Sequence, residues 1–238
     1  MNSDREVSLF AAGIASRKNS LLPSEKLVFE YNFVVTCGNS PETLRALVDA
    51  LRFDAFYVAI SEKFGDDEVR RREALARYFE YSMSEGERRG RLVVWPDPSM
   101  GAAVWLLPAA GSVSDAEAGA RAAFLTEVMG AQGADNYRRI IEFMRPRASS
   151  VIEESAWYLS IVGVAPSAQG QGIGARLLEP TLAEADEAGV DCYLETFDSR
   201  NPRFYQRLGF SAVGSHIEPV TASAYTIMNR RPKPRSRA

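Results

Sequence analysis

The chain has 238 residues, of which 46% are hydrophobic and 25% are charged, a composition typical of a globular protein. Its formal net charge of −3 provides no global basic field, which argues against a nucleic-acid partner, and its single histidine excludes a site built from several histidines. The two cysteines, Cys37 and Cys192, lie far apart and in no metal-ligand spacing, so we expect no disulfide framework, no metal site and a cytoplasmic location.

The first part of the chain predicts a strand followed by two helices. Residues 26–37, KLVFEYNFVVTC, are rich in β-branched and aromatic side chains, as strands are. Ser40 is a good N-cap and Pro41 suits a first helical position, so we expect an amphipathic helix over 41–53. Residues 66–90 predict a second helix, with acids early and bases late as the helix dipole favours.

The middle of the chain predicts a hairpin and then more helix. The segments RLVVWP (91–96) and GAAVWLLP (101–108) flank the turn sequence DPSMG, so we expect two short paired strands. Residues 114–131 and 134–147 predict one or two helices, with a break at Gly133.

The last third of the chain alternates apolar segments with amphipathic ones, as strands and helices do. Gly189 is expected to end a helix at the C′ position, and Pro180 inside that helix predicts a local kink or a missing backbone hydrogen bond. The expected elements are a strand over 157–166, a helix over 172–189, a strand over 190–197, a short helix over 201–210 and a strand over 221–231.

This order of elements predicts an α/β fold with one mixed β-sheet flanked by helices on both sides. No linker divides the chain, so we expect a single domain over residues 26–230. An N-terminal extension over 1–25 would precede it, and a basic tail over 231–238 would follow. No apolar run approaches membrane-spanning length, so we expect no membrane partner.

Three glycines, Gly170, Gly172 and Gly174, alternate between an apolar strand and the start of a helix. Such a junction binds anions, because backbone N–H groups point at the ligand and the helix dipole adds positive potential. A dinucleotide is one candidate, since the spacing also fits G-x-G-x-x-G/A and Glu195 ends the next strand. However, the segment APSAQ separates strand from loop, and too few residues follow Phe197 to complete a dinucleotide-binding fold.

Two sequence motifs follow one another in this region. Gln169–Gly174 follows a VGVAP strand and reads as [Q/R]-x-x-G-x-[G/A], and Arg200–Phe210, RNPRFYQRLGF, contains an N…FYxRxGF segment. Together they resemble the GNAT superfamily of acetyl-CoA-dependent N-acetyltransferases, over roughly Trp157–Phe210. Asn201 and Tyr205 are closer in sequence than in most of that superfamily. With LETFDSRN before them, they are similar to the puromycin N-acetyltransferase group.

The resemblance implies a GNAT fold, in which the central sheet is splayed between two parallel strands, and acetyl-CoA as cosubstrate. The backbone groups of Val162 and Val164 would bind the pantetheine arm, and the glycine loop, Gln169–Ala175, would bind the pyrophosphate. The Tyr205 hydroxyl would act as general acid toward the leaving thiolate. The alternative for Tyr205 is a core aromatic. The implied cofactor-binding residues are Val162, Gly163, Val164, Gln169, Gly170, Gln171, Gly172, Ile173, Gly174, Ala175, Asn201 and Tyr205.

Glu195 is the candidate catalytic base, because it stands late on the strand beside the expected splay. By strict alternation it shares a face with Tyr193 and Phe197, which would point it toward the substrate. It would accept a proton from the amine directly or through water. The alternative is a fixed carboxylate paired with Arg200 or Arg203.

Aromatic residues gather on the elements expected to build the acceptor side. Tyr78, Phe79 and Tyr81 cannot all face one core, because adjacent helix positions point about 100° apart, so some should line a cleft. The candidate acceptor residues are Tyr57, Tyr78, Tyr81 and Trp105, and the acids able to attract a cationic amine are Asp54, Glu62, Asp66 and Asp67.

We therefore expect direct acetyl transfer to a small aromatic or hydrophobic primary amine, by a monomer or homodimer. The alternatives are a protein or peptide N-acetyltransferase of the same fold, and a coenzyme A-binding module without catalysis.

Overall fold

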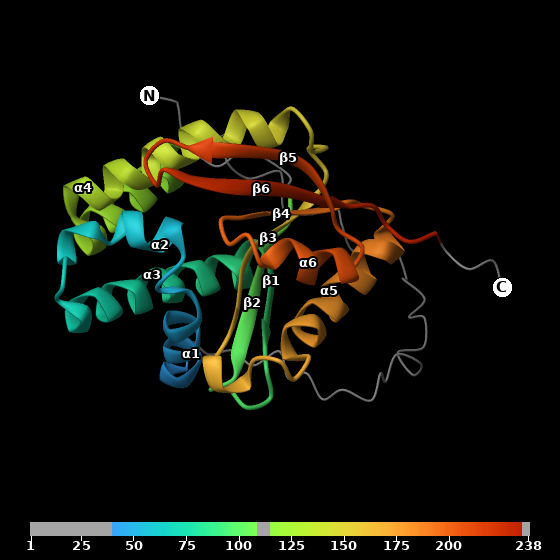
Figure 1. Cartoon of the computed structure of the whole chain (residues 1–238), viewed down its shortest axis with the longest axis horizontal. Helices are drawn as coiled ribbons and strands as arrows, with labels where there is room; N and C mark the ends of the chain where they lie inside the picture. The colour runs from blue at the N-terminus through green and yellow to red at the C-terminus, as the bar shows by residue number, and fades with distance from the viewer. Residues whose placement is uncertain (1–39, 109–114, 235–238) are drawn as a thin grey trace, which may run out of the picture. The chain divides into compact units, whose positions relative to one another are not determined.

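A six-stranded mixed β-sheet runs through this computed structural model, which describes residues 40–108 and 115–234 (Figure 1). The strand order is β1-β2-β3-β4-β6-β5, and only β3 and β4 pair in parallel within the described sheet. The predicted mixed sheet is confirmed, whereas the strand predicted over 26–37 lies outside the described residues. The strands are β1 (Gly90–Val94), β2 (Gly101–Leu106), β3 (Trp157–Val164), β4 (Cys192–Thr196), β5 (Ser211–Glu218) and β6 (Ser223–Arg230).

Helices cover both faces of the sheet, and each face has its own hydrophobic core (Figure 1). One core packs α1–α4 against the sheet and includes Leu47, Phe79 and Ile161. The other packs α5 and α6 against the opposite face and includes Leu177 and Leu194. The helices are α1 (Pro41–Leu51), α2 (Ala55–Ile60), α3 (Glu68–Arg89), α4 (Asp115–Ser149), α5 (Ile173–Ala188) and α6 (Asn201–Arg207), with short 3₁₀ turns η1 (Glu62–Phe64) and η2 (Pro166–Ala168).

The start of α1 follows its sequence signals. The Ser40 hydroxyl accepts a hydrogen bond from the Thr43 N–H at 3.2 Å, and Pro41 takes the first helical position. The helix ends before Arg52, earlier than expected, because the Asp54 carboxylate accepts the Phe56 N–H at 2.9 Å and begins α2. The sequence pattern predicted no separate helix at this position.

The break predicted in α4 at Gly133 lies at Gly130 instead. Gly130 has φ 71° and ψ 173°, a conformation that glycine adopts without strain. Gly133 stays helical for a different reason: a Cβ at this position would lie 2.1 Å from the Ile60 carbonyl oxygen. One glycine thus allows the kink, and the other allows α4 to approach α2 closely.

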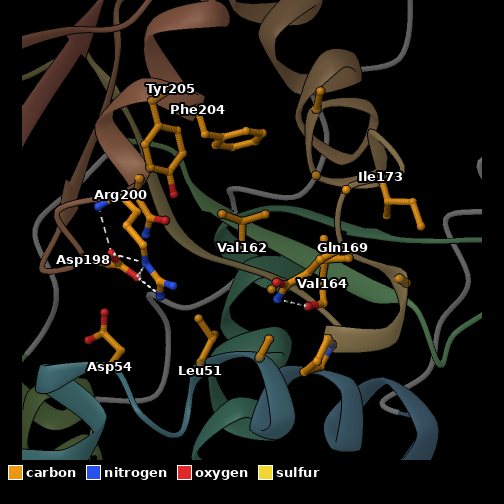
Figure 2. Close-up of a pocket in the computed structure, with 18 of the residues that line it drawn as sticks. Leu51, Asp54, Val162, Val164, Gln169, Ile173, Asp198, Arg200, Phe204 and Tyr205 are labelled. Atoms are coloured by element: carbon orange, nitrogen blue, oxygen red, sulfur yellow. Dashed lines mark hydrogen bonds and ion pairs between the residues drawn. The ribbon is translucent and has the colours of Figure 1, made fainter.

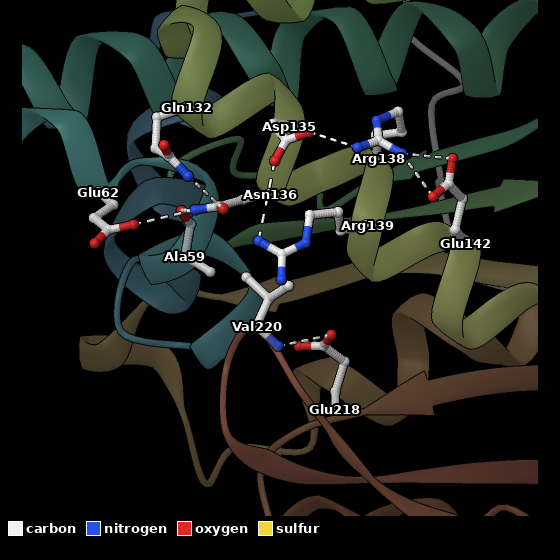
Figure 3. Close-up of polar contacts among 10 residues, drawn as sticks. All are labelled: Ala59, Glu62, Gln132, Asp135, Asn136, Arg138, Arg139, Glu142, Glu218 and Val220. Atoms are coloured by element: carbon white, nitrogen blue, oxygen red, sulfur yellow. Dashed lines mark hydrogen bonds and ion pairs between the residues drawn. The ribbon is translucent and has the colours of Figure 1, made fainter.

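A buried amide fastens α4 to the α2–η1 segment (Figure 3). The Asn136 side chain donates hydrogen bonds to the Ala59 carbonyl oxygen at 2.8 Å and to Glu62 at 3.1 Å. Gln132 in turn donates to the Asn136 side-chain oxygen at 2.9 Å. Because α2 carries Tyr57, this network positions one wall of the site described below.

The two parallel strands diverge after a short shared stretch. Trp157 pairs with Cys192 and Tyr158 with Tyr193, and no further residue pair joins β3 to β4 in the described sheet. On their other sides, β3 stays paired with β2 up to Val164, and β4 stays paired with β6 along its whole length. The predicted splay of the sheet is therefore confirmed.

A β-bulge at Ser160 changes the side-chain pattern of β3. Val104 pairs with Ile161 and Trp105 with Leu159, so Ser160 has no opposite residue on β2. Leu159 consequently packs on the α5 side and Ile161 on the α1–α4 side, although strict alternation would put both on one face. No helix within residues 40–108 and 115–234 has the combination of length and hydropathy that a bilayer crossing needs.

Candidate active site

A cavity of about 1040 Å³, which we call the cleft cavity, opens where β3 and β4 diverge. Figure 2 shows Val162 and Val164 of β3 between Tyr205 of α6 on one side and the end of α1, with Leu51, on the other. The loop before α5 completes the wall. The sequence-predicted cofactor residues come together here, with Gln171 as the exception.

The glycine loop leaves an open cradle at the start of α5. Gly170 and Gly172 both have φ +78°, and a Cβ on either would meet no described atom within 4 Å. Gly172 is the N-cap residue, and no side chain of the described residues caps α5, so the first N–H groups of this helix are available to an anion. Gly174 has another function, since a Cβ there would lie 3.2 Å from the Phe204 ring.

These residues fit the pyrophosphate and pantetheine arm of coenzyme A. The gap between β3 and β4 can take an extended arm, and the uncapped start of α5 lies at the end of that gap. Arg52, Arg200 and Arg207 line the cleft cavity together with Asp49, Asp54 and Asp198, so the lining carries charges of both signs. Gln169 donates its side-chain N–H to the Val164 carbonyl oxygen at 3.1 Å, which holds the loop against β3.

Asn201 and Tyr205 lie one turn apart on α6, as their spacing predicted. The Asn201 side chain donates to the Thr196 hydroxyl at 3.0 Å. The Tyr205 ring is buried between Phe204 and Phe210, while its hydroxyl points into the cleft cavity (Figure 2). Burial and the negative charge of Asp54 raise the pKa of Tyr205, so the hydroxyl stays a proton donor at neutral pH.

A second, smaller cavity of about 180 Å³ lies on the α2–α3–α4 side of the sheet. We call it the aromatic cavity, because its walls include Phe56, Tyr57, Tyr78, Tyr137 and Tyr158. The two cavities share a common wall. Its residues are Leu51, Asp54, Val162, Phe197, Asn201 and Tyr205.

Glu195 of β4 faces the aromatic cavity, as alternation along the strand predicted. The Tyr158 hydroxyl donates to Glu195 Oε2 at 3.5 Å, and Oε1 is buried without a hydrogen-bond partner among the described residues. Burial raises the pKa of Glu195 to about 7. The alternative pairing of Glu195 with Arg200 or Arg203 is not observed among the described contacts, and Arg200 forms an ion pair with Asp198 at 2.6 Å instead.

Asp54 lies on the wall that both cavities share. Burial raises its pKa to about 6, although the hydrogen bond from the Phe56 N–H lowers it. From the sequence, Asp54 was predicted only as one of four acids able to attract an amine. Of the other three, Glu62 binds Asn136, Asp67 caps α3, and none lines either cavity.

The four predicted acceptor residues separate into two pairs. Tyr57 and Tyr78 line the aromatic cavity, where their rings form an edge-to-face pair with 5.8 Å between the centroids. Tyr81 instead stacks on Phe124 of α4 at 4.4 Å. Trp105 is fully buried on the α5 face, because alternation along β2 turns it away from the aromatic cavity. We therefore correct the acceptor set by removing Tyr81 and Trp105.

Tyr137 and Tyr158 are lining residues that the sequence analysis missed. Tyr158 stacks on Tyr193 at 4.7 Å where the two parallel strands still pair, next to the bulge at Ser160. A tyrosine at the start of the β3 segment was the available signal, but its orientation depends on the register with β2. Within the described residues, His, Cys, Asp and Glu side chains form no group of three or more that could hold a metal ion.

Comparisons with known proteins agree with this geometry. Residues 134–212 match a family model described as an acetyltransferase (GNAT) domain. Uncharacterized N-acetyltransferase C550.08 of Schizosaccharomyces pombe is 36% identical over 58 residues, which are 24% of this chain and 24% of that relative. The match thus spans about a quarter of the relative's length.

Two solved structures share the fold. A protein described as histone acetyltransferase HPA2 and related acetyltransferase, from Corynebacterium glutamicum, is 22% identical, with a TM-score of 0.56 over 81% of this chain and 91% of that one. Arylalkylamine N-acetyltransferase 2 from Aedes aegypti is 12% identical, with a TM-score of 0.55 over 81% of this chain and 94% of that one. The predicted GNAT fold is confirmed.

Proposed function

We propose that this chain, which carries a GNAT acetyltransferase domain, transfers an acetyl group from acetyl-CoA to the primary amine of a small molecule. When bound, acetyl-CoA supplies a thioester, whose carbonyl carbon is the electrophile and whose sulfur leaves. The observation that carries the proposal is the common wall between the cleft cavity and the aromatic cavity. A cofactor arm in one cavity and an amine in the other would meet there.

The cofactor-binding part of the proposal uses backbone more than side chains. The N–H groups at the start of α5 would bind the pyrophosphate, favoured by the helix dipole. The backbone of Val162 and Val164 would pair with the pantetheine arm in the gap between β3 and β4. Asn201, which lines the same gap, would hydrogen-bond the arm.

Two side chains are assigned to proton transfer. The Tyr205 hydroxyl would give its proton to the departing sulfur, which needs a group that is still protonated at neutral pH. Glu195 would accept a proton from nitrogen, directly or through water, since burial brings its pKa to about 7. Its buried Oε1, without a partner among the described residues, leaves an acceptor position toward the aromatic cavity.

The acceptor would be a compact amine with an apolar or aromatic body. A volume of about 180 Å³ suits a small molecule, and the tyrosine faces can hold both a flat ring and a cation. The similarity of LETFDSRN, residues 194–201, to the puromycin N-acetyltransferase group also supports a small-molecule acceptor.

A turnover assay tests the proposal. Release of free thiol from acetyl-CoA is measured with 2-phenylethylamine, tryptamine, 1,4-diaminobutane, an aminonucleoside and a lysine-containing peptide. We expect at least one aromatic small amine to exceed background hydrolysis. Acetylation of the peptide alone would replace the proposal with a protein acetyltransferase. Binding of acetyl-CoA without turnover of any amine would indicate a binding module.

A further inference from the structure

The common wall of the two cavities contains a single carboxylate, Asp54, among its six residues. The other five are two aliphatic side chains, a phenylalanine, an asparagine and Tyr205, so only Asp54 can carry negative charge at this junction at neutral pH. Glu195 lines the aromatic cavity but not the cleft cavity. Asp54 is therefore the carboxylate that borders both the cofactor space and the acceptor space.

We propose that Asp54 holds the ammonium group of the acceptor and takes its first proton. This inference rests on the proposed function, because it concerns the same amine. Figure 2 shows the Asp54 carboxylate and the Tyr205 hydroxyl on opposite sides of the cleft cavity and turned toward each other, with the Asp198–Arg200 ion pair drawn between them in this view. A proton acceptor at the N-cap of α2 and a proton donor on α6 thus line the same cavity.

The local structure leaves one carboxylate oxygen for a ligand. Oδ1 accepts the Phe56 N–H at 2.9 Å and thereby fixes the side chain at the start of α2. Oδ2 accepts no hydrogen bond from any described residue. The orientation of the carboxylate is therefore set by the helix cap, and its second oxygen can receive an ammonium N–H.

The charged and titratable groups around Asp54 favour this assignment. Asp198, from the segment after β4, adds negative potential and is itself paired with Arg200. Tyr57 of α2 and Tyr205 of α6 feel the charge of Asp54 and remain neutral. Burial makes Asp54 a stronger base than an exposed aspartate, with its pKa at about 6, yet leaves it anionic at pH 7.

The proton balance of the reaction requires more than one acceptor. An ammonium nitrogen loses two protons before it becomes an amide nitrogen, and the departing sulfur gains one. Asp54 takes the first proton, which frees the nitrogen lone pair to form the N–C bond. Glu195 takes the second, directly or through water, and the C–S bond breaks as Tyr205 gives its proton to sulfur. One proton is released to solvent when the three residues return to their starting states.

The variant Asp54→Asn tests the proposal without removing the helix cap, because asparagine is an equally good N-cap residue. Asp67→Asn is the matched control: Asp67 caps α3 by accepting the Arg70 N–H at 3.2 Å, and it lines neither cavity. We expect turnover of 2-phenylethylamine to fall about 100-fold or more in Asp54→Asn and to stay near the wild-type rate in Asp67→Asn.

The pH profile separates a proton acceptor from a structural residue. With both carboxylates needed as anions, log kcat/KM should fall with a slope of about 2 below pH 6 in the wild type. In Asp54→Asn the slope should be about 1, because only the protonation of Glu195, near pH 7, should remain. A slope of about 2 in Asp54→Asn, with turnover within threefold of the control, would overturn the proposal and leave the proposed function intact.

A binding measurement keeps the test independent of turnover. Calorimetric titration of 2-phenylethylamine into the protein saturated with coenzyme A should show at least about tenfold weaker binding in Asp54→Asn, which is 1.4 kcal/mol. Equal affinity in Asp54→Asn and Asp67→Asn would contradict the proposal. Wild-type protein that binds the amine through Asp54 yet turns over no amine would refute the proposed function instead.

Discussion

The cradle at the start of α5 makes a quantitative prediction for the variant Gly172→Ala. Gly172 has φ +78° and ψ 2°, and an L-residue in this left-handed conformation costs about 1–2 kcal/mol. The added Cβ meets no described atom within 4 Å, so strain is the only expected cost in the free protein. We expect the free energy of unfolding to fall by about 1 kcal/mol and the melting temperature by about 2–4 °C.

Gly172 lines the cleft cavity at the place where the pyrophosphate would bind, and a Cβ there would occupy open space in that region. We therefore expect Gly172→Ala to weaken acetyl-CoA binding by at least about tenfold, which is 1.4 kcal/mol. In the wild type, acetyl-CoA at about 100 times its dissociation constant should add about 2.7 kcal/mol and raise the melting temperature by several degrees. This ligand-induced shift should be much smaller in the variant, and calorimetry should give the weaker affinity directly.

Gly189→Ala is the matched control at the other end of α5. Gly189 is also left-handed, with φ 69° and ψ 32°, and a Cβ there also meets no described atom within 4 Å. It lies outside the lining of the cleft cavity. Both variants should lose similar stability, but only Gly172→Ala should lose affinity. Equal acetyl-CoA affinity in the two variants would refute the assignment of the cradle.

The other predictions concern catalysis, packing and pH. Tyr205→Phe should reduce turnover about 10²–10⁴-fold with little change in melting temperature or acetyl-CoA affinity, and turnover within threefold of wild type would make Tyr205 a packing residue. Asn136→Ala should lower the free energy of unfolding by about 1–3 kcal/mol in a denaturant titration, because the Ala59 carbonyl loses its partner. Gln132→Ala is its control and should cost less. The pKa of Glu195 is about 7 in the folded state and 4.5 in the unfolded state. Its contribution to the free energy of unfolding therefore decreases as the pH rises from 4.5 to about 7. Glu195→Gln should therefore gain stability relative to wild type from pH 5 to pH 8, by up to about 3 kcal/mol; an unchanged difference would mean that Glu195 has an ordinary pKa.

The features that the sequence predicted well are those coded by neighbouring residues. The cap at Ser40 and Pro41 uses contacts three residues apart, and the glycine loop is one continuous motif followed by a helix. The spacing of Asn201 and Tyr205 likewise fixes their common face on α6. In each case the local geometry needs no information from distant parts of the chain.

The features that the sequence analysis missed depend on contacts between distant elements. Gly133 has no side chain to collide with the Ile60 carbonyl oxygen, which belongs to a residue more than seventy positions earlier. The sequence around Gly133 does not reveal this contact, so the glycine was predicted to break the helix. Trp105 faces the α5 core because of the register between β2 and β3. Asp54 gains its place on the common wall only when the chain folds so that the turn after α1 lines the same two cavities as α6.

The divergence of β3 from β4 gives this sheet two edges in its own interior. Edge strands carry rows of unpaired N–H and C=O groups, which is why they attract other extended chains. Here the two edges face each other across a gap too wide for direct pairing, and neither can recruit a strand from another molecule without entering the cleft cavity. The proposed partner, the pantetheine arm, is narrow, extended and contains amides. Under the proposed function, the topology of the sheet would recognise the cofactor arm, and the side chains around it would determine which amine is acetylated.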